Sequence, residues 1–301
     1  MSTLKKKTVS KQKDIKKKPI FKGYFCQIRS RHPSHDILRK NPDLRFPFKS
    51  LVRFGSTTEL DDTAGRVQIN STEAIKNSSS KLKMKKCFDN ANIKTAEWWI
   101  LVQKLDHIVI RTDKDVPYKD STDLSLLPYP IVAKHHFGSR GTGNYLLNSK
   151  QELQNWLHGK DLTRYIFEKF YNYVKEYRLH VTSEGCFYTC RKMLKADIPA
   201  ENRWFRNDSN SVWVLEENPL FDKPKNWQKI VENCVNALKA VGLDIGACDV
   251  KVQSTKTQKN KERDNIDFIV IEINSAASFG EITKEKYLIE LNKLIKNKKN
   301  A

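Results

Sequence analysis

Two segments near the C-terminus carry apolar residues at the spacing of an amphipathic helix. The first runs from Lys223 to Gly242, with Pro224 near its start and Gly242 just past its last apolar residue. Its apolar positions are Trp227, Ile230, Val231, Cys234, Val235, Leu238 and Val241. The second runs from Thr283 to Lys299 and places Tyr287, Leu288, Leu291, Leu294 and Ile295 on one face. We expect both helices to pack against the rest of the protein through these faces.

Shorter apolar runs predict strands and smaller helices upstream. Strands are expected near residues 98–102 and 107–111, and a hairpin is expected from residues 177–183 and 186–193. Residues 71–92 predict one helix capped by Ser71 or Asn70, and residues 151–157 predict a short helix. Residues 19–69 are broken by prolines and predict a small α/β lobe with many loops. The mixture indicates an α+β fold.

Acidic and amide side chains interrupt two apolar, β-branched segments near the C-terminus. Residues 246–253 contain Asp249, and residues 266–274 contain Glu272 and Asn274. A carboxylate on such a strand is costly unless a cation, a donor or water compensates it. Glu272 and Asn274 are two residues apart and leave the same face of a strand. Oxygen ligands of this kind suit a phosphate-bound Mg²⁺, although a polar strand end capped by water would have the same spacing.

A glycine-rich loop lies between two short apolar strands in the middle of the chain. The first strand ends at Lys134, and the loop carries Gly138, Gly141 and Gly143. Glycine lets backbone N–H groups approach an anion, so the loop resembles a flap over phosphates. Its spacing fits neither a P-loop nor a dinucleotide-binding turn. The tip of an ordinary hairpin is the alternative.

Composition is that of a folded protein with one basic extension. A chain of 301 residues with 39% apolar residues can bury a full core. The formal net charge is +20, and residues 1–18 hold eight lysines against one aspartate. Such a block stays solvated, and it predicts nonspecific attraction to nucleic acid, an acidic partner or an anionic surface. The alternative is a lysine-rich arm that only increases solubility.

Cysteine spacing and hydropathy predict the compartment. The six cysteines show no C-x-x-C pair, which favours a reduced protein. No apolar run approaches the ~20 residues needed to span a bilayer. We therefore expect a soluble, cytoplasmic protein, in the host cytoplasm if the chain is viral.

Together these motifs resemble the ATP-grasp superfamily, and within it the carboxylate–amine ligases similar to the ribosomal-protein glutamate ligases. The resemblance covers most of residues 50 to 280 and begins with Asn70, Ala74-Ile75 and Lys81, where Ser80 replaces the family's usual aspartate. It implies a nucleotide held by Lys81 and Lys134, a flap with Gly138, Ser139, Gly141 and Gly143, an adenine hinge at Glu168, Lys169 and Phe170, and Glu176 on the ribose. Asp249, Glu272 and Asn274 match the family's metal ligands.

The resemblance implies a reaction and the residues that carry it. ATP and Mg²⁺ would activate a carboxylate as an acyl phosphate, which an amine then attacks; the acceptor would be an amino acid, a peptide or a protein. Arg178 and Arg191 match positions beside the phosphates and the acceptor, and Arg206 is a further candidate. Without the resemblance, each would be a surface arginine. His180 shares a strand face with Arg178 and is expected to be a hydrogen-bonded structural histidine rather than a base.

The expected organisation has a basic tail (1–18), an N-terminal lobe (19–80), a central lobe with the flap (81–164) and a C-terminal lobe with the metal (165–301). Two other functions stay open. One is a structural or regulatory role in a virus, because residues 52–56 and 204–207 resemble stretches of bacteriophage members. The other is a basic nucleic-acid-binding module, which would present basic and aromatic residues over one continuous surface.

Overall fold

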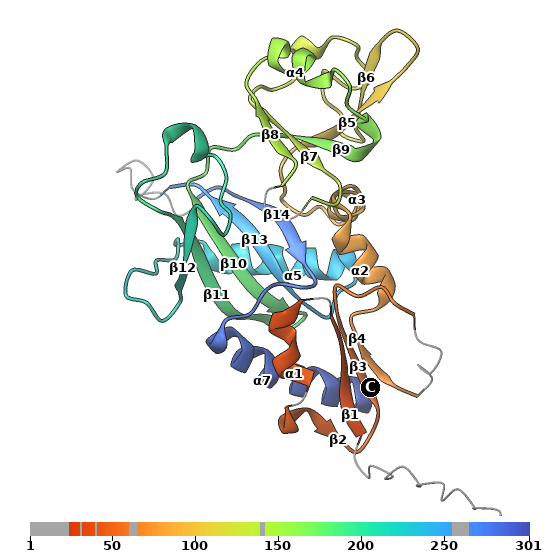
Figure 1. The fold of residues 1–301 in the computed structure, drawn as a ribbon, viewed down its shortest axis with the longest axis vertical. Helices are drawn as coiled ribbons and strands as arrows, with labels where there is room; N and C mark the ends of the chain where they lie inside the picture. The colour runs from red at the N-terminus through yellow and green to blue at the C-terminus, as the bar shows by residue number, and fades with distance from the viewer. Residues whose placement is uncertain (1–23, 31, 40, 60–64, 139–141, 255–264) are drawn as a thin grey trace, which may run out of the picture.

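Three sheets follow one another along the chain, each with its own helices (Figure 1). The computed structural model describes residues 24–301 except 31, 40, 60–64, 139–141 and 255–264. The basic tail and the flap residues Ser139 and Gly141 lie outside the described residues. The α+β class is confirmed.

The N-terminal sheet has the strand order β2-β1-β3-β4. Its strands are β1 (Tyr24–Ser30), β2 (Arg45–Phe46), β3 (Ser50–Phe54) and β4 (Val67–Ile69), with the short helix α1 (Asp36–Arg39) beside them. The last helix of the chain, α7 (Glu281–Asn300), packs on this sheet. Its buried Tyr287, Leu291 and Ile295 share a core with Ile28 and Val52. The predicted apolar face of the C-terminal helix is therefore confirmed.

The predicted helix 71–92 is two helices, α2 (Thr72–Ser79) and α3 (Lys81–Asn90). Ser80 leaves the helical conformation at φ −102° and ψ 116°, and its hydroxyl accepts from the Lys83 N–H at 3.4 Å. The prediction of one helix is wrong because serine competes for backbone donors and caps a new helix instead of continuing the old one. The cap places Lys81 at the first turn of α3.

The central sheet has the order β6-β5-β9-β7-β8 and is antiparallel. Its strands are β5 (Trp98–Gln103), β6 (Ile108–Arg111), β7 (Ile131–His135), β8 (Asn144–Leu147) and β9 (Tyr165–Lys169), and α4 (Lys150–Leu157) joins β8 to β9. Trp99, Leu153 and Phe167 form the core between sheet and helix. Val132 pairs with Glu168, so alternation puts Lys134 and Glu168 on the face turned away from that core.

The C-terminal sheet has the order β12-β11-β10-β13-β14 and is also antiparallel. Its strands are β10 (Lys175–Thr182), β11 (Gly185–Leu194), β12 (Ser211–Leu215), β13 (Ile245–Val252) and β14 (Phe268–Asn274). Helix α5 (Trp227–Val241) covers one face with Ile230, Cys234 and Leu238 and ends at Gly242, whose φ is +80°. Helices α2 and α3 contribute to the same core. The opposite face contacts α7 through His180 and Tyr287 at one end and lines a cavity at the Asp249 end.

Within the described residues, short 3₁₀ helices occupy five connections, at Pro33–His35, Pro42–Leu44, Leu124–Leu126, Leu162–Arg164 and Ala200–Asn202. Among the helices of the described chain, none combines the length and apolarity that crossing a membrane requires.

Candidate active site

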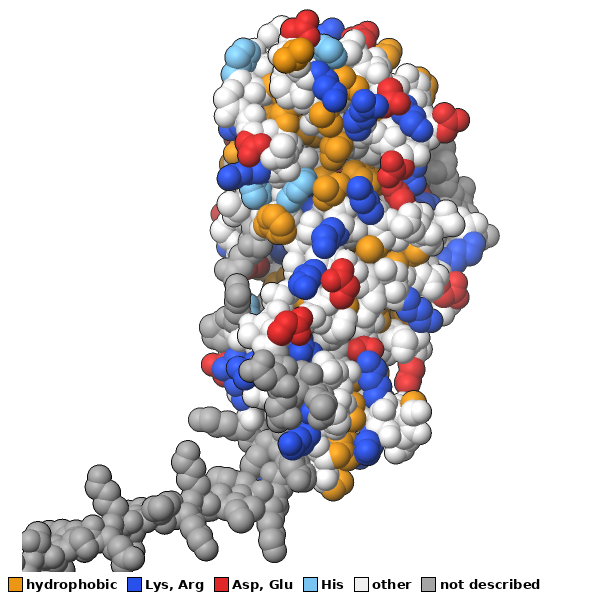
Figure 2. All heavy atoms as spheres, turned by 90° about the vertical axis from the view of Figure 1, so that its right-hand side faces the viewer, with side chains coloured by type: hydrophobic (Ala, Val, Ile, Leu, Met, Phe, Trp, Pro, Cys, Tyr) orange, Lys and Arg blue, Asp and Glu red, His pale blue; other side chains and the backbone are white. Residues whose placement is uncertain are grey.

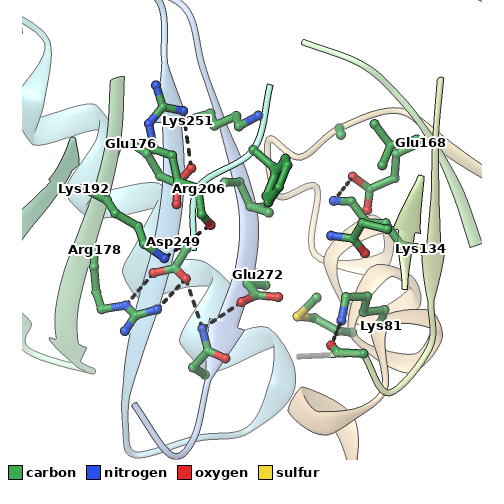
Figure 3. Close-up of a pocket in the computed structure, with 18 of the residues that line it drawn as sticks. Lys81, Lys134, Glu168, Glu176, Arg178, Lys192, Arg206, Asp249, Lys251 and Glu272 are labelled. Carbon is green, nitrogen blue, oxygen red and sulfur yellow. Dashed lines mark hydrogen bonds and ion pairs between the residues drawn. The ribbon is translucent and has the colours of Figure 1, made fainter. Parts of the chain in front are cut away.

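A cavity of about 460 Å³ lies between the face of the C-terminal sheet opposite α5 and a wall made by α3 and the central sheet. Figure 3 shows Asp249, Glu272 and Arg178 on the first wall facing Lys81 and Lys134 on the second. The segment Trp204–Asp208, which joins β11 to β12, and the loop Ser275–Ser278 after β14 also line the cavity.

Asp249, Glu272 and Asn274 meet at one place on the sheet. Asp249 pairs with Glu272 across β13 and β14, and Asn274 follows two residues later on the same strand. The Asn274 amide nitrogen lies 3.3 Å from Asp249 Oδ2 and 3.1 Å from Glu272 Oε1, so an N–H pair bridges the two carboxylates. Two carboxylates and an amide around one point are the oxygen donors that Mg²⁺ takes together with phosphates. The residues therefore fit the predicted metal.

Arg178 holds Asp249 from the neighbouring strand. Its Nε and Nη2 donate to the two carboxylate oxygens at 2.7 and 2.8 Å, and its guanidinium lies 4.8 Å from the ring centre of Trp213. Burial alone would lower the pKa of Arg178, but the Asp249 carboxylate outweighs it and raises this pKa. The bidentate pair fixes Asp249 in one orientation.

The opposite wall carries three lysines around one buried glutamate. Lys134 Nζ lies 2.6 Å from Glu168 Oε2, and Lys85 Nζ lies 3.2 Å from Glu168 Oε1. Burial alone would raise the pKa of the Glu168 carboxyl, but the two ammonium groups hold it below its usual value. Lys81 donates to the Gly138 carbonyl at the base of the flap. Burial lowers the pKa of Lys81, and the Glu272 carboxylate across the cavity partly offsets this.

The flap base needs glycine at position 138. A Cβ there would lie 2.5 Å from the backbone oxygen of Thr142, closer than any real Cβ contact. Gly143 has φ +76°, which favours glycine, but it does not line the cavity.

The far end of the cavity combines aromatic and charged side chains. It is lined by Lys169 at the end of β9, by Phe170 and Tyr171 directly after it, and by Glu176 from β10. Lys251 lies two residues from Asp249 on β13; its ammonium donates to the Trp204 carbonyl at 3.2 Å and lies 5.3 Å from the Phe170 ring centre. Burial lowers the pKa of Lys251 to about 8 despite the nearby Glu176 carboxylate. Burial likewise raises the pKa of Glu176.

Arg206 closes this end from the β11–β12 connection. Its Nη1 lies 3.7 Å from Glu176 Oε2, and its Nη2 donates to the Val174 carbonyl. Lys192 Nζ donates to the Arg206 carbonyl at 3.4 Å, so the connection is tied to both neighbouring strands.

Most predicted site residues line this one cavity, but Arg191 does not. Its guanidinium pairs with Asp222 on the face covered by α5, and Lys192 lines the cavity in its place. The cause is a bulge in the pairing of β10 with β11. Near the turn Thr182 pairs with Gly185, and a regular ladder continued from there would place Arg191 opposite Glu176. Because the register shifts by one residue at His180/Val181, Lys192 lies opposite Glu176 instead. One extra residue exchanges the two faces of a strand.

Sequence reasoning also missed Lys251 and His32, which both line the cavity. Alternation from Asp249 could have found Lys251, whereas nothing in the sequence places His32 of the N-terminal lobe in the cavity beside β13 and β14. His180 does not line the cavity; its Nδ1 lies 2.9 Å from the Tyr287 hydroxyl, and the ring is buried.

No protein-family model matches the chain, and no curated protein matches it in sequence. Solved structures do match. The D-alanine–D-alanine ligase from Bacillus anthracis complexed with ATP is 15% identical, with 89% of this chain and 84% of that one covered at a TM-score of 0.54. Another structure of that ligase gives 14% identity, 76% and 71% coverage, and a TM-score of 0.52.

A third match is the carboxyaminoimidazole ribonucleotide synthase from Aspergillus clavatus complexed with ATP. It is 18% identical, and the match covers 82% of this chain and 60% of the synthase at a TM-score of 0.55. At identities this low, the matches show a shared fold and nothing more. The chain therefore has the ATP-grasp fold that its sequence motifs resemble.

Proposed function

We propose that the protein is an ATP- and Mg²⁺-dependent ligase that joins a carboxylate to an amine through an acyl phosphate. One observation carries the proposal: Asp249, Glu272 and Asn274 converge on one point, and Lys81 and Lys134 face them across a cavity. Two of the matched structures are complexes with ATP, which supports ATP as the nucleotide.

The nucleoside would lie at the Phe170 end of the cavity. The backbone of Lys169 and Phe170 would bind the base, and Glu176 would accept from the ribose hydroxyls. Glu176 now faces Arg206 at 3.7 Å, so we expect this ion pair to loosen when ribose binds. Binding would free the Arg206 guanidinium for the phosphates or the substrate.

The first step brings two anions together. A carboxylate oxygen of the substrate attacks the γ-phosphorus of ATP, the bond to the β–γ bridging oxygen breaks, and ADP leaves. Lys81, Lys134 and Lys192 would screen the repulsion and stabilise charge on the transferring group. Bound Mg²⁺ would supply further neutralisation of the phosphates. Arg178 keeps the Asp249 carboxylate oriented throughout.

In the second step, a neutral amine attacks the acyl carbon, and the tetrahedral intermediate expels phosphate with cleavage of the C–O bond. The nitrogen loses one proton, which the departing phosphate takes up as HPO₄²⁻. Arg206 and Lys192 are the cations placed to stabilise the oxyanion. The flap, anchored through Lys81 and Gly138, would keep water from the acyl phosphate. The products are an amide, ADP and phosphate.

The test is to incubate the protein with ATP, Mg²⁺ and pools of amino acids and peptides, and to follow ADP release and product mass. We expect a product lighter than its two components by one water, formed only with Mg²⁺. Asp249→Asn and Glu272→Gln should reduce the rate by about 100-fold or more. Glu285→Gln on the exposed face of α7 is the control. Wild-type turnover in both site variants would refute the proposal.

The one face of the molecule that Figure 2 shows gives no support to a nucleic-acid-binding module. On the face in Figure 2, lysine and arginine side chains alternate with aspartate and glutamate rather than gathering in one patch. A nucleic-acid surface would show continuous positive charge with aromatic residues between.

A further inference from the structure

The loop that follows the metal strand is anchored to the N-terminal lobe. Ser275–Phe279 comes directly after Asn274, and His35 Nε2 donates to the Ala277 carbonyl at 2.8 Å. His35 is fully buried, with its ring centre 4.5 Å from Phe54 and 4.4 Å from Phe279. Gly55 packs against Ala276 so closely that a Cβ at Gly55 would lie 2.9 Å from the Ala276 Cβ. The two lobes therefore meet beside the metal residues.

Hydrogen bonds in this junction fix the tautomers of two histidines. Because a carbonyl only accepts, His35 carries its proton on Nε2, and its Nδ1 accepts from Ser30 Oγ at 2.5 Å. His32 Nδ1 accepts from the Ser34 N–H at 3.2 Å and lies 2.6 Å from Ser34 Oγ, which itself accepts from the Phe279 N–H. The lone pair of His32 Nδ1 is therefore engaged, and the neutral ring carries its proton on Nε2.

His32 lies at the substrate side of the metal residues. Lys251 and Asp249 are two residues apart on β13, about 7 Å along the strand. Asn274 pairs with Ala247, on the other side of Asp249 from Lys251. The order along the sheet is thus nucleoside pocket, metal residues and then the Ser275–Ser278 loop, beside which His32 lines the cavity. A substrate that meets the γ-phosphate from the side opposite the nucleoside must enter here.

We propose that His32 binds the carboxylate substrate, donating from Nε2–H to the oxygen that does not attack the phosphorus. This inference rests on the proposed ligase function and adds to it a substrate-binding residue from the N-terminal lobe. An oxygen anion fits the N–H donor of a ring that lines the cavity, whereas an attacking amine must keep its only lone pair for the acyl carbon. For the same reason His32 is no general base, since neither of its nitrogens has a free lone pair.

The first test reads the tautomer directly. Two-bond ¹H–¹⁵N spectra of ¹⁵N-histidine-labelled wild-type protein should show His32 protonated on Nε2, with the signal assigned by its loss in His32→Gln. Acetyl phosphate added together with Mg²⁺ and ADP should shift this signal. A proton on Nδ1, or a signal that acetyl phosphate leaves unchanged, would overturn the inference, and neither result depends on finding the natural substrate.

The second test separates substrate binding from nucleotide binding. With the carboxylate component that supports turnover, His32→Leu should raise its KM about tenfold or more and leave the KM for ATP unchanged. His32→Gln keeps an N–H at similar reach and should recover most of the loss, which a folding defect would not. His158→Leu, on the exposed end of α4, is the control.

Two outcomes are distinguishable. Wild-type turnover with an unchanged carboxylate KM in His32→Leu would overturn this inference alone. A wild-type protein that binds no Mg²⁺·ATP would overturn the proposed function, and the acetyl phosphate titration would then decide the role of His32 as an anion donor by itself.

Discussion

At the scale of residues, the site depends on which face of a strand each side chain leaves. Alternation from Asp249 and within Glu272 and Asn274 was enough to predict that the three converge, and the structure brings them within hydrogen-bonding distance. Arg191 was placed in the site by the family resemblance alone, and this was wrong because a bulge, which the periodicity of the strands does not reveal, turns its side chain to the other face. The sequence showed which strand residues are charged, but it could not show which residues of β10 and β11 lie opposite each other.

Adjacent cations on β11 therefore offer a matched pair. Lys192→Met removes an ammonium group from the cavity and should lower kcat/KM by about 10- to 100-fold. Arg191→Met removes a cation of the Asp222 cluster on the other face, so it should lower thermal stability with little effect on turnover. ADP release and thermal unfolding of both variants check this. The reverse outcome, a folded but inactive Arg191→Met beside an active Lys192→Met, would contradict the observed register.

At the scale of elements, helices could be predicted where the residues inside and next to them determine where they begin and end. The positions of helices α5 and α7 could be predicted from the spacing of their apolar residues and from the residues at their ends. The break at Ser80 could not, because it depends on whether a single serine side chain caps a new helix. Contacts between elements are a different matter, as Asn70 shows. It has φ +61°, and its buried amide donates to the Arg53 and Ile245 carbonyls and accepts from the Asp244 and Ile245 N–H groups.

Asn70 thus joins β3 and β4 to the first residue of β13, the strand that carries Asp249. Asn70→Ala should lower the free energy of unfolding by about 2–4 kcal/mol, because buried partners lose their hydrogen bonds. Asn92→Ala is the matched control, since Asn92 also has positive φ (53°) but is exposed. Urea unfolding measures both. Equal losses would mean that backbone strain, rather than the hydrogen bonds, sets the cost.

At the scale of the whole molecule, the lobes are joined by contacts distant in sequence. Helix α7 completes the core of the N-terminal sheet, and α2 and α3 complete that of the C-terminal lobe. Such pairings, like the position of His32 in the cavity beside β13 and β14, have no local signal and could not be predicted from periodicity.

Two buried histidines make these junctions sensitive to acid. Burial lowers the pKa of His35 to about 4 and that of His180 to about 3, from an ordinary value near 6.5. Between pH 6.5 and 4 these histidines bind protons in the unfolded chain but stay neutral in the native protein. The free energy of unfolding is therefore highest above pH 6.5 and decreases as the pH falls below it. Each histidine contributes at most about 1.4 kcal/mol per pH unit.

Urea unfolding at pH 7.5, 6 and 5 should show this loss, and His35→Gln should reduce its slope. His158→Gln should leave the slope unchanged. A wild-type stability that stays constant or rises from pH 6.5 to 5 would show that these imidazoles are accessible to protons in the native state.

The basic tail is predicted to act apart from the cavity. A protein starting at Pro19 lacks the eight lysines of residues 1–18. It should keep its rate with small substrates and lose any binding to nucleic acid that weakens steeply with salt. ADP release and binding titrations at two salt concentrations test this, and loss of turnover on truncation would place the tail in the active site.

The central claim is that Asp249, Glu272 and Asn274 form a Mg²⁺ site that holds the phosphates of ATP. Calorimetric titration with a non-hydrolysable ATP analogue, with Mg²⁺ or with a chelator, tests it most directly. The wild type should bind at least about tenfold more tightly with Mg²⁺, and Asp249→Asn should lose that difference. Asp222→Asn, which removes a carboxylate from the Lys175 and Arg191 cluster outside the cavity, should retain it. Binding that is equally tight with and without Mg²⁺ in wild type and Asp249→Asn alike would contradict the account.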